Sequence, residues 1–597
     1  MRLSRHVAVP LLLAAAGLCA PAQAAPVHAP SDPNQAFAAE FGDRFFEAYW
    51  PLRPDLAISV GYYNVADRLL PFDARERAVE AVFLKRELAA LKRYAPESLN
   101  DANRTDQALL RNELESELWH QQELRDWQWD PSGYNVANSF ALLLNTDYAP
   151  LEQRLRTVSR RLARVPAYYA AAWANLSHPT REHTQLAIQQ HQGTLDLFGA
   201  DLENQVVSSA LSMDERLLLL KRIDAARAAI KGYIEHLAAL DARLAKNGKP
   251  RSFRLGRALY EKKFGYDIQS AGSAEDLYQR ALTEKGRLLE RMDGLATQLW
   301  PKYMGDAAPP QDRFDRIGQL IARMSDHHSA AADFVPTVEK LIPQLEDWVS
   351  SHDLIDLDKD KPLQVRVTPA YERGVSVASI DAPGPYNAQA STYFNVTPLD
   401  DMGAERAESF LHEYNDWMLP ILIIHEAIPG HYVQLIYANR SPSRIKSIFG
   451  NGAMIEGWAV YSERMMLESG YGGGTPEMWL MWCKWNLRSV TNTILDYSVH
   501  VLGMSRDDAI KLLAHEAFQS QEEASGKWRR VQLSSVQLAS YFSGYSQIYD
   551  FREQLKQEQG EAFKLKAFHE QLLSYGSAPV KLIRELMQNK KGSEDAR

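Results

Sequence analysis

The stretch that decides how this chain folds and what it does is Ile421–Gln434, ILIIHEAIPGHYVQ, in which an apolar run leads into a His-Glu pair. Two histidines of one helix bind a single zinc ion when they lie four residues apart. Here His425 and His431 lie six residues apart. On an undisturbed helix that separation is a rotation of about 600°, so the two imidazoles would face different directions.

A Pro-Gly pair between the two histidines predicts a local correction of this phase difference. Pro429 has no N–H for the carbonyl of His425, and its ring crowds that carbonyl. Gly430 can adopt backbone angles that other residues avoid. We therefore predict a bulge of two residues that places His431 beneath His425. The spacing alone also allows a second interpretation, in which both are core histidines beside a kink.

A third ligand is predicted from the segment 452–465, GAMIEGWAVYSERM. Glu456 stands there in an apolar helical context, and Glu463 follows seven residues later on the same face. Glutamate-type zinc peptidases hold zinc with two histidines of one helix and a glutamate of a following helix. We predict one Zn²⁺ ion on His425, His431 and Glu456. Glu426 is then the general base for the water that the metal activates. If the metal were absent, Glu456 would be a surface acid.

The first 24 residues predict an export signal. Arg2 and Arg5 precede an apolar run from 7 to 20, and an Ala-Gln-Ala cleavage triplet ends at Ala24. We expect the mature protein to be periplasmic or secreted. Lipid attachment through Cys19 is the less favoured alternative, because the leucine before it is bulky where a small residue is preferred.

Bulk composition narrows the classes of function. The 597 residues are 45% hydrophobic and 24% charged, with a net charge of −9, so no basic surface for nucleic acid is expected. Beyond the signal, no apolar run approaches the roughly 18 residues of a membrane span. Only two cysteines occur, so a zinc site of thiolates is excluded and Cys483 has no partner in the mature chain.

The pattern along the chain predicts a mainly α-helical protein of two lobes. After a flexible lead at 25–35, a helical lobe is expected at 36–360 and a catalytic lobe at 361–597. Capping boxes at 212–215 and 273–276 predict two helix starts. Three short β-branched or aromatic segments within 361–398 predict a small sheet beside the metal-site helix.

HEAIPGH followed by EGWAVYSE resembles the bacterial family catalogued as domain of unknown function 885. Three further stretches agree, 260–292, 488–510 and 534–544, and the resemblance spans most of the mature chain. In the last stretch Val536 stands where the family has glycine. The resemblance implies a helical, zincin-like architecture related to oligopeptidases. It also implies a metal on His425, His431 and Glu456, with Glu426 as the base.

A polar stripe recurs every four residues along one predicted helix: Arg488, Asn492, Asp496 and His500. It is either a solvated face or the lining of the cleft. In the second case His500 or Arg488 holds an oxyanion or a substrate carboxylate, and Asp496 orients His500.

Tyrosines at 541, 545 and 549 also repeat every four residues. Such stripes are mostly core packing, which we favour for Tyr549, whereas Tyr541 is a candidate donor to the oxyanion. The strands near 374–397 are candidates for binding an extended peptide by edge pairing, with Tyr393 and Asn395 near the cleft.

Taken together, these patterns predict an exported zinc metallopeptidase that hydrolyses short peptides. Two alternatives stay open: a zinc hydrolase of other amides or esters, and a catalytically silent periplasmic binding or scaffold protein. The sequence does not indicate exo- or endo-cleavage, side-chain preference, the native metal or the oligomeric state.

Overall fold

The computed structural model describes residues 32–594 apart from 248, 369–377, 383, 388–390, 400–401 and 442. The predicted signal peptide, Cys19 and most of the predicted flexible lead lie outside the described residues. The described chain is mainly helical with one small sheet, as the sequence predicts.

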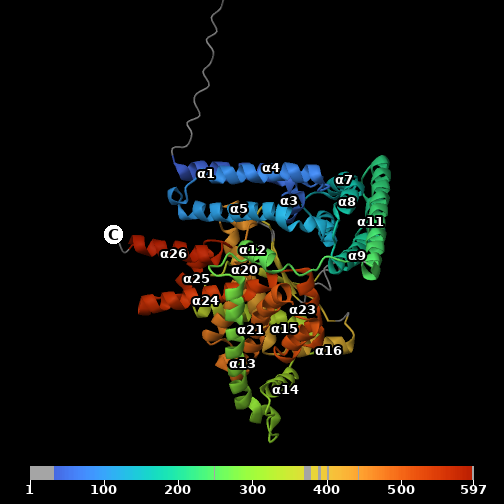
Figure 1. Cartoon of the computed structure of the whole chain (residues 1–597). Helices are drawn as coiled ribbons and strands as arrows, with labels where there is room; N and C mark the ends of the chain where they lie inside the picture. Colours follow the sequence, from blue (N-terminus) through green and yellow to red (C-terminus); the bar gives the residue numbers. More distant parts are fainter. Residues whose placement is uncertain are drawn as a thin grey trace, which may run out of the picture.

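The N-terminal helices form the upper part of the molecule in Figure 1, where α4 and α5 lie side by side and α11 is the long helix at one end. They are α1 (Pro33–Phe41), α2 (Asp43–Tyr49), α3 (Pro54–Ser59), α4 (Ala74–Leu91), α5 (Asp101–Trp119), α6 (Ala137–Asn145), α7 (Leu151–Leu162), α8 (Val165–Asn175), α9 (Arg181–Leu197), α10 (Ala200–Ser208) and α11 (Met213–Asn247).

The rest of the chain forms the lower part, in which α13 packs along α21 and α20 packs against α24 (Figure 1). Its helices are α12 (Arg257–Asp267), α13 (Ala274–Met304), α14 (Arg313–Ser325), α15 (Phe334–Ser351), α16 (Ala404–Glu413), α17 (Met418–Glu426), α18 (His431–Asn439), α19 (Arg444–Ile448), α20 (Gly452–Glu468), α21 (Pro476–Tyr497), α22 (Arg506–Ile510), α23 (Gln521–Leu533), α24 (Ser540–Gln559), α25 (Leu565–Leu573) and α26 (Val580–Glu594).

Both predicted capping boxes open helices. Ser212 accepts from the Glu215 N–H at 3.3 Å, and the Glu215 carboxylate accepts from the Ser212 N–H at 2.9 Å, at the start of α11. Ser273 and Asp276 make the same reciprocal pair at the start of α13. Each box satisfies two N–H groups that a helix start otherwise leaves unpaired.

The small sheet has the order β1-β3-β2, with β1 (Leu363–Val367) parallel to β3 (Thr392–Val396) and β2 (Ala378–Asp381) antiparallel to it. Strand β2 contacts α17, so the sheet lies beside the predicted metal-site helix. The central strand is β3, and both of its edges are already paired. Among the described strands, edge pairing with an extended peptide would therefore involve β1 or β2, and that mode of binding stays a prediction.

Buried apolar side chains gather in separate clusters along the chain. One holds residues between Ile58 and Leu240, and another, the largest, holds residues from Ala281 to Met587. The large cluster runs through the predicted lobe boundary at 360/361, because α13 to α15 pack on the same core as the later helices. A third cluster joins the first helices to Ile445 and Phe449, which ties the upper part to α19.

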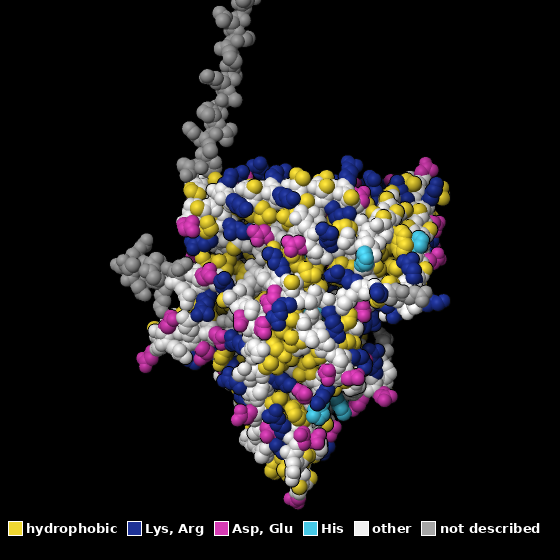
Figure 2. All heavy atoms as spheres, viewed as in Figure 1, with side chains coloured by type: hydrophobic (Ala, Val, Ile, Leu, Met, Phe, Trp, Pro, Cys, Tyr) yellow, Lys and Arg dark blue, Asp and Glu magenta, His cyan; other side chains and the backbone are white. Residues whose placement is uncertain are grey.

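One apolar stretch and one thiol stand out among the described residues. One described stretch, Met418–Asn439, is long and apolar enough to span a bilayer, yet 78% of it is buried, as in a core helix. Charges of both signs are interspersed over the face seen in Figure 2. Cys483 is a free, buried thiol, and burial raises its pKa to about 12.

A buried histidine makes the fold sensitive to acid. His569 on α25 has Nε2 2.7 Å from the Tyr461 hydroxyl, and its Nδ1 donates to the Leu354 carbonyl at 2.8 Å. Arg552 donates to the Tyr461 hydroxyl at 3.5 Å, which leaves the hydroxyl hydrogen free to be donated to Nε2 of the neutral ring. Burial lowers the pKa of His569 to about 4. The unfolded state binds this proton more tightly, so the stabilisation is complete above pH 6.5 and is lost as the pH falls towards 4.

We expect this residue to contribute about 3 kcal/mol of acid sensitivity between pH 6.5 and 4. Chemical denaturation of the wild type and His569→Gln at several pH values, both with a chelator present, measures the difference. The stability of the wild type should fall more steeply on acidification. Parallel curves for the two proteins would contradict the assignment.

Candidate metal centre

The predicted bulge is in fact a complete break between two helices. Helix α17 ends at Glu426 and α18 begins at His431. In the connection the Gly430 N–H donates to the Ile424 carbonyl at 2.9 Å, which holds residues 427–430 in a compact turn. A Cβ on Gly430 would lie 1.9 Å from the His425 carbonyl oxygen, so only glycine fits this turn.

The break brings the three predicted ligands together. The rings of His425 and His431 are 4.8 Å apart between centroids and nearly perpendicular. Glu456 on α20 presents one carboxylate oxygen to both of them, 3.7 Å from Nε2 of His425 and 3.5 Å from Nε2 of His431. All three ligand atoms lie within 4.8 Å of one another, which allows one ion between them.

A buried carboxylate behind His425 fixes the orientation of its ring. Nδ1 of His425 lies 2.7 Å from Oε1 of Glu463, and Nε1–H of Trp485 donates to the same oxygen at 2.9 Å. With the proton on Nδ1, the lone pair of Nε2 points towards Glu456. Metal-binding histidines commonly donate their second N–H to such a carboxylate. Sequence analysis placed Glu463 on the correct helix face but gave it no role, and it missed Trp485.

Three successive residues of α20 build the centre in different ways. Glu456 supplies the carboxylate. Gly457 lies where α20 crosses α24, and a Cβ there would stand 2.4 Å from the Cα of Gly544. Trp458 donates its indole N–H to the Pro429 carbonyl at 2.8 Å, which holds the connection between α17 and α18 in place. The segment 456–458 therefore positions both halves of the centre.

The electrostatics of the group favour a cation. Among the described residues, no lysine or arginine forms an ion pair with Glu426, Glu456 or Glu463. Burial alone lowers the pKa of His425, but the neighbouring carboxylates of Glu456 and Glu463 outweigh it and raise the pKa well above 6.5. Burial raises the pKa of Glu456, but the two histidines outweigh it and hold that pKa well below its usual range. Three carboxylates around two imidazoles are a donor set that fits a divalent ion.

Two further predicted residues lie at this centre. Tyr541 on α24 has its ring 6.5 Å from that of His425 and roughly parallel to it. Its hydroxyl accepts from Arg530 at 3.4 Å, a residue that sequence analysis missed. Glu426 is half-buried at the end of α17, and no hydrogen bond to it occurs among the described residues. Its carboxylate contributes to raising the pKa of His425.

The predicted polar stripe of α21 is buried rather than solvated. Arg488 pairs with Glu523 at 2.7 Å, and its guanidinium lies 4.7 Å from the Trp485 ring, one layer behind Glu463. His500, just beyond α21, lies 2.9 Å from the Val531 carbonyl, and burial lowers its pKa to about 4. None of its contacts among the described residues reaches the three ligands, so the structure does not bring His500 to the centre.

Asp496 does not serve chiefly to orient His500. Its carboxylate accepts from the N–H groups of Val536 and Leu538, each at 3.1 Å. Val536, which stands where the family has glycine, adopts φ 69°, a backbone region that β-branched residues rarely enter. The Asp496 hydrogen bonds hold this turn at the entrance to α24, the helix of Tyr541.

The remaining tyrosines and the sheet residues are engaged elsewhere. Tyr545 and Tyr549 accept from Arg464 at 2.8 and 2.6 Å. Tyr393 lies under the guanidinium of Arg366, and Asn395 accepts from the same arginine at 2.6 Å. The described contacts of Tyr393 and Asn395 therefore lie within the sheet.

Removal of the carboxylate behind His425 tests how the ring is held. We expect Glu463→Ala to lower zinc affinity about 10- to 100-fold, because His425 loses the acceptor that fixes its ring. Glu463→Gln keeps an oxygen at that place, so its zinc affinity should lie between those of the wild type and Glu463→Ala. Competition titration of zinc against a chelator measures the affinities. An unchanged affinity in Glu463→Ala would contradict the orienting role.

Comparisons with known proteins agree with this picture of the fold. A family model described as "Bacterial protein of unknown function (DUF885)" matches residues 54–587. A solved candidate lipoprotein of unknown function from Shewanella oneidensis is 51% identical, with a TM-score of 0.86, over 92% of this chain and 99% of its own. No curated protein sequence matches.

A second solved candidate lipoprotein, from Colwellia psychrerythraea, has a TM-score of 0.72 over 94% of this chain and 99% of its own. It is 16% identical, so this likeness concerns the fold alone. The family match, by contrast, extends over most of the sequence, the HEAIPGH and EGW segments included. The chain therefore belongs to the DUF885 family of bacterial proteins.

Proposed function

We propose that this protein is an exported zinc metallopeptidase with a zincin-like helical architecture, acting on short peptides. The observation that carries the proposal is the convergence of His425, His431 and Glu456 from three helices, next in the chain to Glu426, which has no ion-pair partner among the described residues. A carboxylate with no cation partner, adjacent in the chain to a metal ligand, is what general-base chemistry needs.

The roles of the residues follow from their places. A zinc ion held by His425, His431 and Glu456 would supply a Lewis acid and lower the pKa of water towards about 7. Glu426 accepts the proton of the attacking water and delivers it to the leaving amine. Tyr541 donates its hydroxyl hydrogen to the oxyanion that forms on the scissile carbonyl. Glu463 keeps His425 oriented and touches neither water nor substrate.

Digestion of a defined peptide library by the purified mature chain tests the proposal. We expect cleavage that stops on zinc chelation and returns when zinc is added back. A matched panel of esters and non-peptide amides separates a peptidase from another zinc hydrolase. Intact zinc with no turnover on any of these substrates would overturn the proposal and leave a binding or scaffold protein.

The place of action is proposed to be outside the cytoplasm. The solved relatives are named as candidate lipoproteins, which is consistent with export and strengthens the alternative of a lipid on Cys19. Mass spectrometry of the mature N-terminus distinguishes the two routes. Cleavage after Ala24 leaves an unmodified alanine, whereas lipid attachment leaves a diacylglyceryl cysteine.

A further inference from the structure

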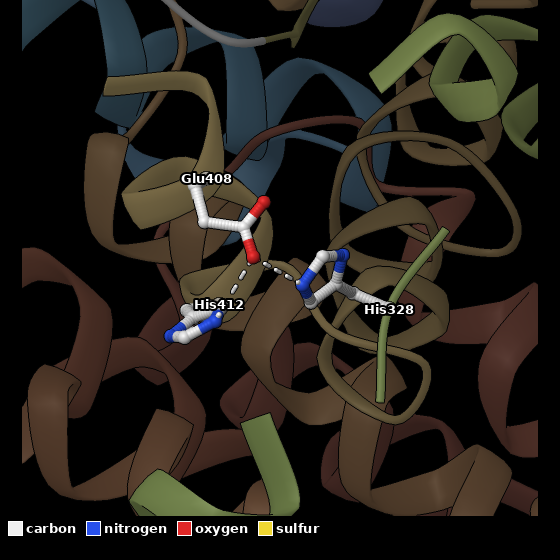
Figure 3. Close-up of side chains that lie close together, drawn as sticks. All are labelled: His328, Glu408 and His412. Atoms are coloured by element: carbon white, nitrogen blue, oxygen red, sulfur yellow. Dashed lines mark hydrogen bonds and ion pairs between the residues drawn. The ribbon is translucent and has the colours of Figure 1, made fainter. Parts of the chain in front are cut away.

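A second cluster of two histidines and a carboxylate lies where α14 and α16 meet. His328 is in the segment that follows α14, and Glu408 and His412 stand one turn apart on α16. Figure 3 shows both imidazoles directed at the same carboxylate. One ligand atom from each residue lies within 4.8 Å of the others.

The distances in this cluster fit a small tetrahedral ion. Nε2 of His328 lies 3.2 Å from Oε1 of Glu408, and Nε2 of His412 lies 3.5 Å from the same oxygen. Ligands bound to zinc at 2.0–2.1 Å in a tetrahedron are roughly 3.3 Å from one another. These two contacts therefore match two edges of a zinc coordination sphere, and all three ligand atoms lie within 4.8 Å of one another.

The contacts of His328 hold its ring between a backbone carbonyl and the Glu408 carboxylate. Nδ1 of His328 donates to the Ser329 carbonyl at 2.8 Å. Its other nitrogen, Nε2, faces a carboxylate oxygen at 3.2 Å, where a metal ion or a shared proton would satisfy both atoms. A backbone carbonyl behind the ring is also a common means of orienting a metal-binding histidine.

A fourth donor stands next to the cluster. Oδ1 of Asp326 is 4.0 Å from Nε2 of His412, and its other oxygen accepts from Arg323 at 2.7 Å. Asp326 is half-exposed, and so are Glu408 and His412, whereas the side chain of His328 is 13% exposed. The cluster thus has one inner ligand and a rim that is open to solvent.

Hydrogen bonds outside the cluster hold its two segments at a fixed separation. The Asp416 N–H donates to the His327 carbonyl at 3.0 Å, and the Asn415 amide donates to the Ser325 hydroxyl at 3.2 Å. These bonds join the end of α14 to the chain just after α16. The ligands are therefore arranged before any ion binds, which lowers the conformational cost of binding.

We propose that His328, Glu408 and His412 form a second site for a divalent metal of the zinc class, with Asp326 or water completing the coordination. This site is independent of the proposed peptidase centre. The Asn415 side chain accepts from the Met418 N–H at 3.1 Å, at the start of α17, the helix that carries His425. The ion would brace the α14–α16 junction on which α17 begins.

Zinc titration of the metal-free chain against a competing chelator tests the proposal. We expect two zinc ions per wild-type chain and one in His412→Gln, which keeps the ion at His425. His431→Ala should keep only the ion at His328 and His412. His352→Gln, at an exposed histidine outside both clusters, is the matched control and should bind two.

Cobalt(II) provides a second readout, because its visible absorption reports the ligand set. In the His431→Ala background, cobalt should give absorption that disappears when His412→Gln is added. The proposal is overturned if the wild type and His412→Gln bind the same number of zinc ions. It is equally overturned if the cobalt spectrum of His431→Ala is unchanged by the second substitution. Neither result bears on whether the His425 centre cleaves peptides.

Discussion

Glu426→Gln is expected to remove the proposed peptidase turnover while zinc still binds at the proposed His425 centre. The substitution preserves the size of the side chain but leaves an amide that cannot accept the proton of the attacking water. General acid–base groups typically contribute about 10²–10⁴-fold to the rate, so kcat should fall by that factor. Zinc should stay bound, because His425, His431 and Glu456 are unchanged and Glu426 makes no described hydrogen bond that supports them.

Two measurements on one sample distinguish a loss of catalytic rate from a loss of bound zinc. Elemental analysis gives the zinc content, and hydrolysis of a peptide that the wild type cleaves gives kcat and KM. Glu97→Gln, at an exposed glutamate of the N-terminal part, is the matched control and should behave as the wild type. Turnover in Glu426→Gln within a few-fold of the wild type would remove Glu426 from the role of base.

Gly430→Ala is expected to abolish zinc binding at the same centre and to destabilise the fold. The new Cβ would lie 1.9 Å from the carbonyl oxygen of His425 and 2.3 Å from that of Ile424. Both obstacles are backbone atoms of α17, so no side chain can turn aside to make room. Overpacking of a core typically costs 1–3 kcal/mol, and here we expect about 3 kcal/mol or more. Relief of the clash must move His425 and His431 apart.

The matched control is Gly452→Ala, at the start of α20. A Cβ there meets only the Ser540 hydroxyl, at 3.8 Å, which is ordinary contact. Alanine is a better helix former than glycine, so this variant should be as stable as the wild type or slightly more so. Chemical denaturation and zinc content are measured for both variants. A Gly430→Ala protein with normal stability and zinc would show that the turn does not hold the two histidines together.

The sequence predicted the structure best where a feature depends only on residues close together in the chain. The capping boxes at Ser212 and Ser273 each depend on residues three apart, and both predicted helix starts are confirmed. The Pro-Gly pair correctly predicted that the helix is interrupted between His425 and His431. The form of the interruption differs from the predicted bulge, because α17 ends at Glu426 and a separate helix, α18, begins at His431. Spacing gives the phase of two side chains but not the path of the backbone between them.

Features that depend on distant contacts were not predictable in this way. The periodicity of His500 suggested a cleft, yet the structure turns this ring towards the carbonyls of Val531 and Ser534. Trp485 contacts the centre through a hydrogen bond to Glu463, which precedes it by 22 residues. No sequence motif predicted this contact. The order of the strands likewise comes from pairing, so the central place of β3 could not be read from its residues.

The contact between Gly457 and Gly544 fixes how closely α20 and α24 approach each other. The two helices touch there through main chain alone, and any larger residue at either position would force them apart. Glu456 lies on α20 and Tyr541 lies on α24. A side chain at either glycine would therefore increase the distance between Glu456 and Tyr541, so the spacing of these two residues depends on both glycines.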